Sequence, residues 1–199
     1  MTISRRPFLG LLLSAIASPA QDTQDLKLAR QLADERTQKA AVQELLASGR
    51  QKIPMLLSWI NRPPLPLDEV QLATFRAGLA QAFGALRVRE AIPFLLDHIA
   101  VRPSPFTGPP WRTPETVLDR LPAVAALIEI GPDALNAILN HPSEPCRLDE
   151  RLARAFVVSR IASTVPDKSS ATRYLRSVAG EARLEAYWTD EALRFAEVQ

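Results

Sequence analysis

Four segments of the sequence carry apolar residues at the spacing that places them on one face of an α-helix. In three segments these residues occupy relative positions 0, 3, 4 and 7, and the remaining segment lacks the last position. The segments recur about every 40 residues, and helices repeated in this way bury their apolar faces by stacking on their neighbours. The four apolar stripes are Ile53, Leu56, Leu57 and Ile60; Ile92, Leu95, Leu96 and Ile99; Leu135, Ile138 and Leu139; and Ala171, Tyr174, Leu175 and Val178.

A second segment, rich in small apolar residues, precedes each stripe, so the expected repeating unit is a pair of helices. Small side chains allow two helix axes to approach each other closely. Gly49 and Gly131 follow two of these segments, and glycine there favours the left-handed backbone conformation that ends a helix. No stretch alternates polar and apolar residues strictly enough to predict a strand. The sequence therefore predicts an all-α fold.

Proline and capping residues mark where the helices begin. Proline is tolerated in the first turn because the amide hydrogen that it lacks has no partner there. Asp68 with Gln71 matches the reciprocal capping pattern, and Thr113-Pro114-Glu115 is the expected cap for the first helix of the third unit. The prolines expected near the start of the second helices are Pro54, Pro93, Pro132 and Pro166.

Residues 1–20 have the composition of an export signal. Arg5 and Arg6, followed by Phe8 and Leu9, resemble the twin-arginine motif of bacterial signals, except that Gly10 stands where lysine is common. A short apolar run and small residues follow, which predicts cleavage at the end of this range and a periplasmic or extracytoplasmic protein. The export route, twin-arginine or general, stays open. A retained N-terminal anchor is the alternative to cleavage, although the run is short for a bilayer.

Loss of this signal changes the charge balance of the chain. The full sequence has 24 basic and 22 acidic side chains, and the signal removes only Arg5 and Arg6, so the mature chain has 22 of each. A neutral mature chain argues against nucleic acid as a partner. The single cysteine, Cys146, allows no disulfide within the chain, and no cysteine follows the apolar run for lipid attachment.

Parts of the second and third units resemble HEAT repeats, particularly the short bacterial HEAT-like type. The resemblance rests on Ala82-Phe83-Gly84-Ala85-Leu86-Arg87 followed by Glu90-Ala91-Ile92-Pro93-Phe94-Leu95-Leu96, and on Ala125-Ala126-Leu127 with Ile130-Gly131 and Ala134-Leu135. It implies a right-handed α-solenoid of about four helix pairs with a scaffold or binding role; some HEAT-like proteins are bilin lyases or nucleic-acid repair proteins. The expected units span about residues 26–60, 68–100, 115–141 and 147–179, with a capping helix over residues 181–197, in a single domain of residues 21–199.

The inner curve of such a solenoid, formed by the second helices, is the expected partner surface. If Met55 and Phe94 are exposed there, they form an apolar groove suited to a peptide or a helix. The alternative is that one or both pack beneath neighbouring loops. Repeat register gives this surface two columns of side chains, namely Met55, Phe94, Ala137 and Arg173, and then Ser58, Asp97, Asn140 and Arg176.

Three proline-rich connections, residues 61–67, 101–113 and 140–146, each join the second helix of one unit to the first helix of the next. Stacked units would place all three on one edge. The middle connection carries Phe106 and Trp111. These aromatic side chains either cover apolar core between two units or anchor a partner.

Few residues of the sequence are suited to catalysis or metal binding. His98 and His141 share a repeat position with Trp59 and Ser177, so the two imidazoles could approach one metal. Asp97 and Asn140 are the nearby candidates for a further ligand. Solvated histidines at helix edges are the favoured interpretation. The sequence predicts no catalytic residue, no metal ligand and no cofactor.

The sequence thus predicts a non-catalytic, exported interaction module that binds a protein or peptide partner, with no nucleic acid partner and no stable membrane span after signal cleavage. The alternative is an enzyme accessory or lyase-like HEAT-like protein, which requires Cys146, His141 and Asp97 to share one pocket. The candidate partner-binding residues are Met55, Trp59, Phe94, Asp97, His98, Phe106, Trp111, Asn140, His141, Arg173 and Arg176.

The cost of truncating an apolar side chain is expected to depend on its distance from the middle of the predicted stack. Leu95→Ala is expected to lower the free energy of unfolding by about 2–5 kcal/mol, through lost burial and a residual cavity. Leu26→Ala, near the N-terminal edge, is expected to cost less than about 1 kcal/mol. Urea unfolding of the two variants measures both losses. A larger loss for Leu26→Ala would mean that the repeat register is assigned wrongly.

Overall fold

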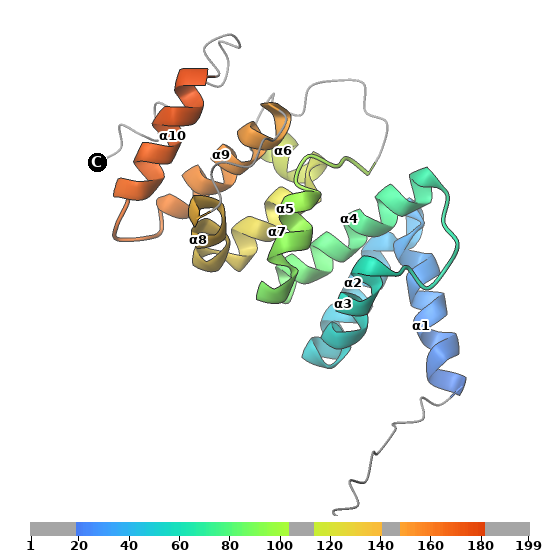
Figure 1. Cartoon of the computed structure of the whole chain (residues 1–199). Helices are drawn as coiled ribbons and strands as arrows, with labels where there is room; N and C mark the ends of the chain where they lie inside the picture. Colours follow the sequence, from blue (N-terminus) through green and yellow to red (C-terminus); the bar gives the residue numbers. More distant parts are fainter. Residues whose placement is uncertain (1–18, 104–113, 141–147, 182–199) are drawn as a thin grey trace, which may run out of the picture.

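The computed structural model describes residues 19–103, 114–140 and 148–181 (Figure 1). Within these ranges the regular secondary structure is helical and includes no strand, which confirms the predicted all-α fold. Residues 1–18 of the predicted signal and residues 182–197 of the predicted capping helix lie outside the described residues. The same holds for Phe106, Trp111, His141 and Cys146.

The described ranges contain ten α-helices and two short 3-10 helices. The α-helices are α1 (Pro19–Leu32), α2 (Glu35–Ser48), α3 (Ile53–Asn61), α4 (Glu69–Ala85), α5 (Ile92–Asp97), α6 (Pro114–Arg120), α7 (Pro122–Ile130), α8 (Pro132–Asn140), α9 (Leu148–Ala162) and α10 (Ser169–Glu181). The 3-10 helices are η1 (Gly49–Lys52) and η2 (Arg89–Ala91), which lead into α3 and α5.

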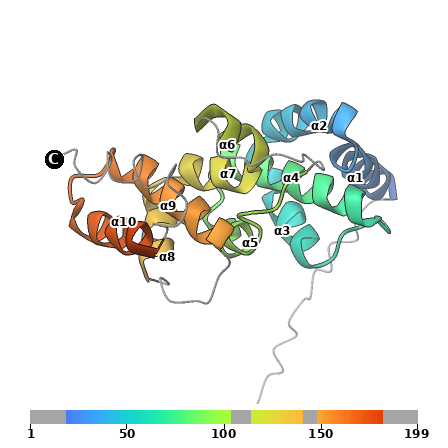
Figure 2. The ribbon, with the colours of Figure 1, turned by 90° about the horizontal axis from the view of Figure 1, so that it is seen from above.

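The helices follow one another in a row, with α1 at one end and α10 at the other (Figure 1; Figure 2). The first helices of successive pairs contact one another, because α2 packs on α4, α4 on α7, and α7 on α9. The second helices lie beside them: α5 contacts α7, α8 contacts α7 and α9, and α10 contacts α8 and α9. Helix α1 packs on α2 and α4 at the N-terminal end.

The apolar stripes face the interior of this row. Leu56, Leu95 and Ile138, each the second member of its stripe, are fully buried. In α10 the second member, Tyr174, is only half-buried, and the following residue, Leu175, is buried instead. Ala171 and Val178, the first and last members of this stripe, are buried as well, so α10 faces the core through three of the four predicted residues.

Most helix starts follow the predicted signals. Asp68 and Gln71 form the expected capping box, in which the Gln71 N–H donates to Asp68 Oδ1 at 2.8 Å and the Asp68 N–H donates to Gln71 Oε1 at 3.2 Å. Pro54 and Pro93 lie in the first turns of α3 and α5, and Pro132 is the first residue of α8. These local signals therefore position the second helices as predicted.

One predicted helix start needs correction, and the glycines at two helix ends have a backbone conformation that differs in part from the predicted one. Pro166 does not begin α10, which starts at Ser169, where the Asp167 carboxylate accepts hydrogen bonds from the Ser169 N–H at 2.9 Å and hydroxyl at 2.7 Å. Gly49 and Gly131 end α2 and α7 at positive φ values of 62° and 82°, as expected. Their ψ values of −152° and −135° lie outside the left-handed helical region, in a conformation that is essentially confined to glycine.

The first helix of the third unit is also broken, although the sequence suggested one helix there. Helix α6 ends at Arg120 and α7 begins at Pro122, and the residue between them, Leu121, has φ −121° and ψ 79°. A proline disfavours the helical region for the preceding residue, and Pro122 has no N–H to donate to the last turn of α6, so both effects favour the break. Val117 and Leu121 are buried, so α6 still contributes to the core.

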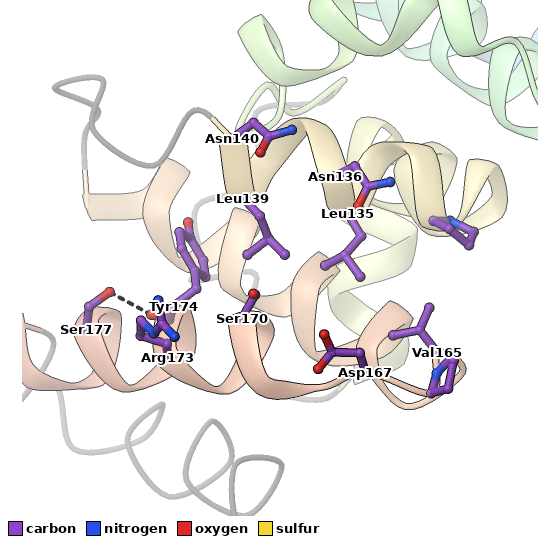
Figure 3. A pocket seen from close by; sticks show the side chains of 12 residues that line it. Leu135, Asn136, Leu139, Asn140, Val165, Asp167, Ser170, Arg173, Tyr174 and Ser177 are labelled. Atoms are coloured by element: carbon purple, nitrogen blue, oxygen red, sulfur yellow. Dashed lines mark hydrogen bonds between the residues drawn. The ribbon is translucent and has the colours of Figure 1, made fainter.

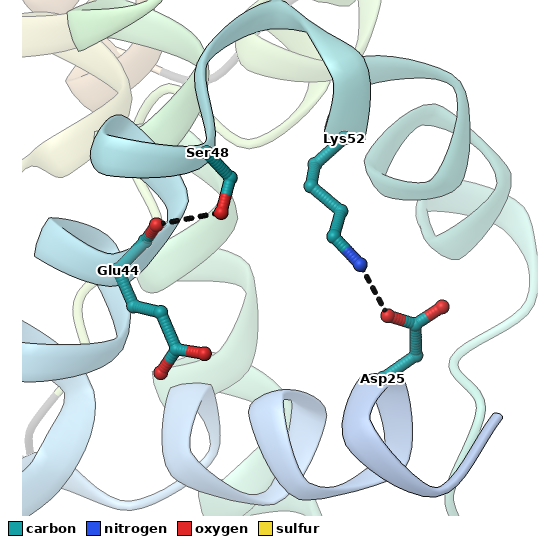
Figure 4. Close-up of polar contacts among 4 residues, drawn as sticks. All are labelled: Asp25, Glu44, Ser48 and Lys52. Atoms are coloured by element: carbon teal, nitrogen blue, oxygen red, sulfur yellow. Dashed lines mark hydrogen bonds and ion pairs between the residues drawn. The ribbon is translucent and has the colours of Figure 1, made fainter. Parts of the chain in front are cut away.

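Polar contacts join α1 to the helices that follow it. The side-chain amide of the buried Gln38 donates to the carbonyl oxygens of Leu32 at 3.1 Å and Thr74 at 2.5 Å, so one side chain of α2 connects α1 and α4. Lys52 of η1 forms an ion pair with Asp25 of α1 at 2.7 Å (Figure 4). The N-terminal edge is thus tied down, although Leu26 itself is 36% exposed.

Helices α4 and α7 approach each other so closely at Gly84 that a side chain at this residue would clash with α7. A Cβ atom built on Gly84 of α4 would lie 2.6 Å from the Cα of Ala126 in α7 and 2.9 Å from its Cβ. Real Cβ atoms essentially never lie so close to another backbone, so this separation requires glycine at residue 84. Here the small residues of the first helices allow the close approach that the sequence predicts.

Gly84→Ala is therefore expected to lower the free energy of unfolding by about 1–3 kcal/mol, because the backbone of α7 must move away. Gly78→Ala in the same helix is the matched control. Its Cβ would meet side-chain atoms only, namely Leu32 Cδ2 at 2.9 Å and Gln38 Nε2 and Cγ at 3.2 Å and 3.3 Å, and alanine gains about 1 kcal/mol of helix propensity, so a smaller loss is expected. Urea unfolding compares the two variants. Equal losses would show that the Gly84–Ala126 contact does not set the helix separation.

Candidate functional site

A groove of about 760 Å³ lies between α8 and α10, where the second helices of the last two pairs face each other (Figure 3). Both helices pack on α9, so one element holds the two walls in place. The connection between α9 and α10 closes one end through Val165, Pro166 and Asp167. This volume falls within the range of ligand-binding clefts in proteins.

The floor of the groove is apolar. Leu135 and Leu139 point from α8 toward α10, and Tyr174 of α10 lies on the other side of the gap (Figure 3). Leu135 is buried, whereas Leu139, Tyr174 and Val165 are half-buried. These four side chains therefore leave apolar surface that is open to a bound molecule.

Polar side chains line the rim. Asn136 and Asn140 are exposed and lie one turn apart on α8, and Ser170, Arg173 and Ser177 come from α10. The Asn136 amide, the Asn140 amide and the Arg173 guanidinium have no hydrogen bond or ion pair to the part of the chain that the structure describes. The groove thus combines an apolar floor with hydrogen-bonding groups that are available to a ligand.

One carboxylate of the rim is already held by the protein. The backbone N–H and the hydroxyl of Ser169 donate to Asp167, and these hydrogen bonds lower the pKa of its carboxyl below the ordinary aspartate value. Asp167 therefore stays ionised throughout the neutral range and orients its charge toward the start of α10, where the helix dipole favours it.

The structure brings together two of the predicted partner-binding residues, Asn140 and Arg173, in this groove. Arg176 is exposed on α10 but does not line the groove. The next residue of α10, Ser177, lines the groove instead. The structure therefore does not bring Arg176 together with Asn140 at this groove.

The predicted apolar groove at Met55 and Phe94 is not present. Phe94 is only 5% exposed and its ring packs edge-to-face on Phe83, with 5.9 Å between ring centroids. Met55 is half-buried against the core, and Trp59 is buried with its ring centroid 6.0 Å from that of Phe75. The Phe94 and Trp59 rings pack against α4, so Met55 and Phe94 do not form an exposed apolar groove, although Trp59 also lines an open hollow with Ser58, Arg62 and residues 63–66.

Of the histidine and acidic candidates, His98 and Asp97 lie within the described residues and His141 lies outside them. His98 caps the end of α5, where its Nδ1 lies 2.9 Å from the Phe94 carbonyl oxygen and its ring centroid lies 4.6 Å from that of Phe94. Asp97 is exposed beside it. No group of three or more His, Cys, Asp or Glu side chains that could hold a metal ion occurs within residues 19–103, 114–140 and 148–181.

Among the polar side chains of the groove, the sequence predicts Asn140 and Arg173 as partner-binding residues but not Asn136, Asp167, Ser170 and Ser177. Asn136 precedes the Ala137 column by one position, and the apolar lining residues Leu135, Leu139 and Tyr174 were expected only in the apolar stripes. A signal for the observed start of α10 is Asp167-Lys168-Ser169, an acceptor and a hydroxyl two residues apart after Pro166.

Among the described residues, no single helix is long and apolar enough to cross a membrane. The consecutive helices α7 and α8 pass that test as a pair, by length and composition, with a bend of 110° between them.

No protein-family model, no curated protein and no solved structure matches this chain.

Phe94→Ala is expected to lower the free energy of unfolding by about 3–5 kcal/mol, because it removes a buried ring and leaves a cavity beside Phe83. Asp97→Ala, on the same helix but exposed, is the control and is expected to change stability by less than about 0.5 kcal/mol. Thermal and urea unfolding of both variants measure the difference. If the two losses are similar, the Phe94 ring is not part of the core.

Proposed function

We propose that this chain is an exported HEAT-like α-solenoid that binds a protein or peptide partner in the groove between α8 and α10. Support for the solenoid comes from the four apolar stripes and from the successive contacts of α2, α4, α7 and α9. Support for export comes from the basic, apolar and small residues of the first twenty positions. The HEAT-like resemblance implies a scaffold or binding role.

The groove is the observation on which the binding proposal depends. Leu139 and Tyr174 offer apolar contact area, while Asn136, Asn140 and Arg173 offer hydrogen bonds that the described part of the protein does not use. Apolar contacts supply most of the binding free energy in such sites, and a few placed polar groups supply orientation and specificity.

A photo-crosslinking experiment tests this location. Asn136→benzoylphenylalanine places a photoreactive group on the groove rim, and Asn61→benzoylphenylalanine places the same group on an exposed asparagine at the end of α3, outside the groove. With the full chain expressed in its own host, irradiation is expected to yield a specific protein adduct at residue 136 and none at residue 61.

The same adduct from both sites, or no adduct from residue 136, would count against a partner in this groove. Leu139→Glu serves as the second variant, because a charge on the apolar floor is expected to abolish the adduct formed at residue 136. Circular dichroism of this variant shows whether its helices remain folded. A folded Leu139→Glu variant that still forms the adduct would also contradict the proposal.

A further inference from the structure

The lining of the groove carries one cationic and one anionic side chain, Arg173 and Asp167, which lie apart from each other in Figure 3. Arg173 is exposed and lines the groove, and its guanidinium makes no hydrogen bond or ion pair within the described ranges. Asp167, the acidic side chain of the lining, already accepts two hydrogen bonds from Ser169. An incoming carboxylate therefore meets a free planar cation, which binds carboxylates through paired hydrogen bonds.

The two amides of α8 have the spacing of peptide groups. Asn136 and Asn140 are four residues apart, which corresponds to about 6 Å along a helix axis. Alternate residues of an extended chain are about 6.6 Å apart, and each asparagine side chain can both donate to and accept from a peptide group. An extended segment lying along α8 can therefore pair with both amides at once.

The length of the groove limits the length of the bound segment. Helix α8 has nine residues, or about 13 Å, which matches about four residues of extended polypeptide. Side chains of an extended segment alternate in direction. One side chain can therefore enter between Leu139 and Tyr174 while its neighbour points toward the rim that carries Arg173.

From these features we propose that the groove binds a short extended segment of a partner protein in which a carboxylate lies next to an apolar residue. Arg173 binds the carboxylate, Asn136 and Asn140 pair with the backbone, and the apolar side chain packs on Leu139 and Tyr174. This inference rests on the proposed binding function, and it names the chemistry of the partner.

An array of immobilised hexapeptides tests this specificity. Two adjacent central positions are varied through all amino acids between flanking glycines, the ends are blocked by acetyl and amide groups, and the array is probed with the full-length protein. Selection of aspartate or glutamate beside an apolar residue is expected. A parallel set with free C-terminal carboxylates shows whether the carboxylate comes from a side chain or from a chain end.

Three variants then assign the contacts, with fluorescence anisotropy on the best hexapeptide of the array. Arg173→Gln is expected to weaken binding at least about tenfold, which is the loss of a charge-assisted hydrogen bond. Arg176→Gln removes the same charge from the same helix outside the groove and is expected to leave the affinity within about twofold. Asn140→Ala is expected to weaken binding by about threefold to tenfold, whereas Asn61→Ala has no effect.

Three results would overturn this specificity. The protein could select basic peptides from the array, it could select peptides without an acidic preference, or Arg173→Gln and Arg176→Gln could lower the affinity equally. Capture of a synthetic peptide of residues 182–199 or of a second copy of the chain, without binding of any array peptide, would replace the inference with those occupants.

If the residue 136 adduct forms but the array shows no acidic preference, the binding function stands and only this specificity fails. If the array result is as expected but no adduct forms, the chemistry of the groove stands and the partner proposal fails.

Discussion

The row of helices depends on the close contact between α4 and α7. At Gly84 the two backbones are separated by no side chain of α4, and the Cα of Ala126 occupies the space that a Cβ would need. This contact joins the N-terminal helices α1 to α5 to the C-terminal helices α7 to α10, because α7 continues the packing onto α9. Since α5 packs on α7 and α8 packs on α7 and α9, the positions of the second helices follow from how closely the first helices approach.

At the N-terminal end of the row, hydrogen bonds from a buried polar side chain hold the first helix in place. The carbonyl oxygen of Leu32 lies at the end of α1, where helix geometry leaves it without an intrahelical partner. Gln38 satisfies this acceptor in a buried setting where an unpaired carbonyl is costly, and the same amide group also donates to the Thr74 carbonyl oxygen within α4. Helix α1 therefore covers the apolar face of α2 and α4 through Leu28, Ala29 and Leu32, and is fixed in orientation by hydrogen bonds.

Local signals allowed the sequence to predict much of this fold. The apolar spacing predicted that Leu56, Leu95 and Ile138 are buried, and the capping residues predicted that α4 begins after Asp68. Both predictions depend only on residues that are close together in the chain. The site was harder to predict, because it depends on how distant elements turn toward each other. The hydrogen bonds from Ser169 to Asp167 start α10 three residues after Pro166, and whether a ring such as Phe94 is exposed depends on the space beside α4.

The groove depends on the side chains that α8 and α10 turn toward each other. Leu135 and Leu139 point from α8 toward α10, and Tyr174 lies on the other side of the gap (Figure 3). The other α10 residues of the lining include Ser170 and Ser177, whose short side chains leave space beside the Tyr174 ring. The Ser177 hydroxyl donates to the Tyr174 carbonyl oxygen at 2.7 Å, which turns it toward its own helix. Longer side chains at residues 170 and 177 would occupy the gap, so the open volume between α8 and α10 depends on these two serines.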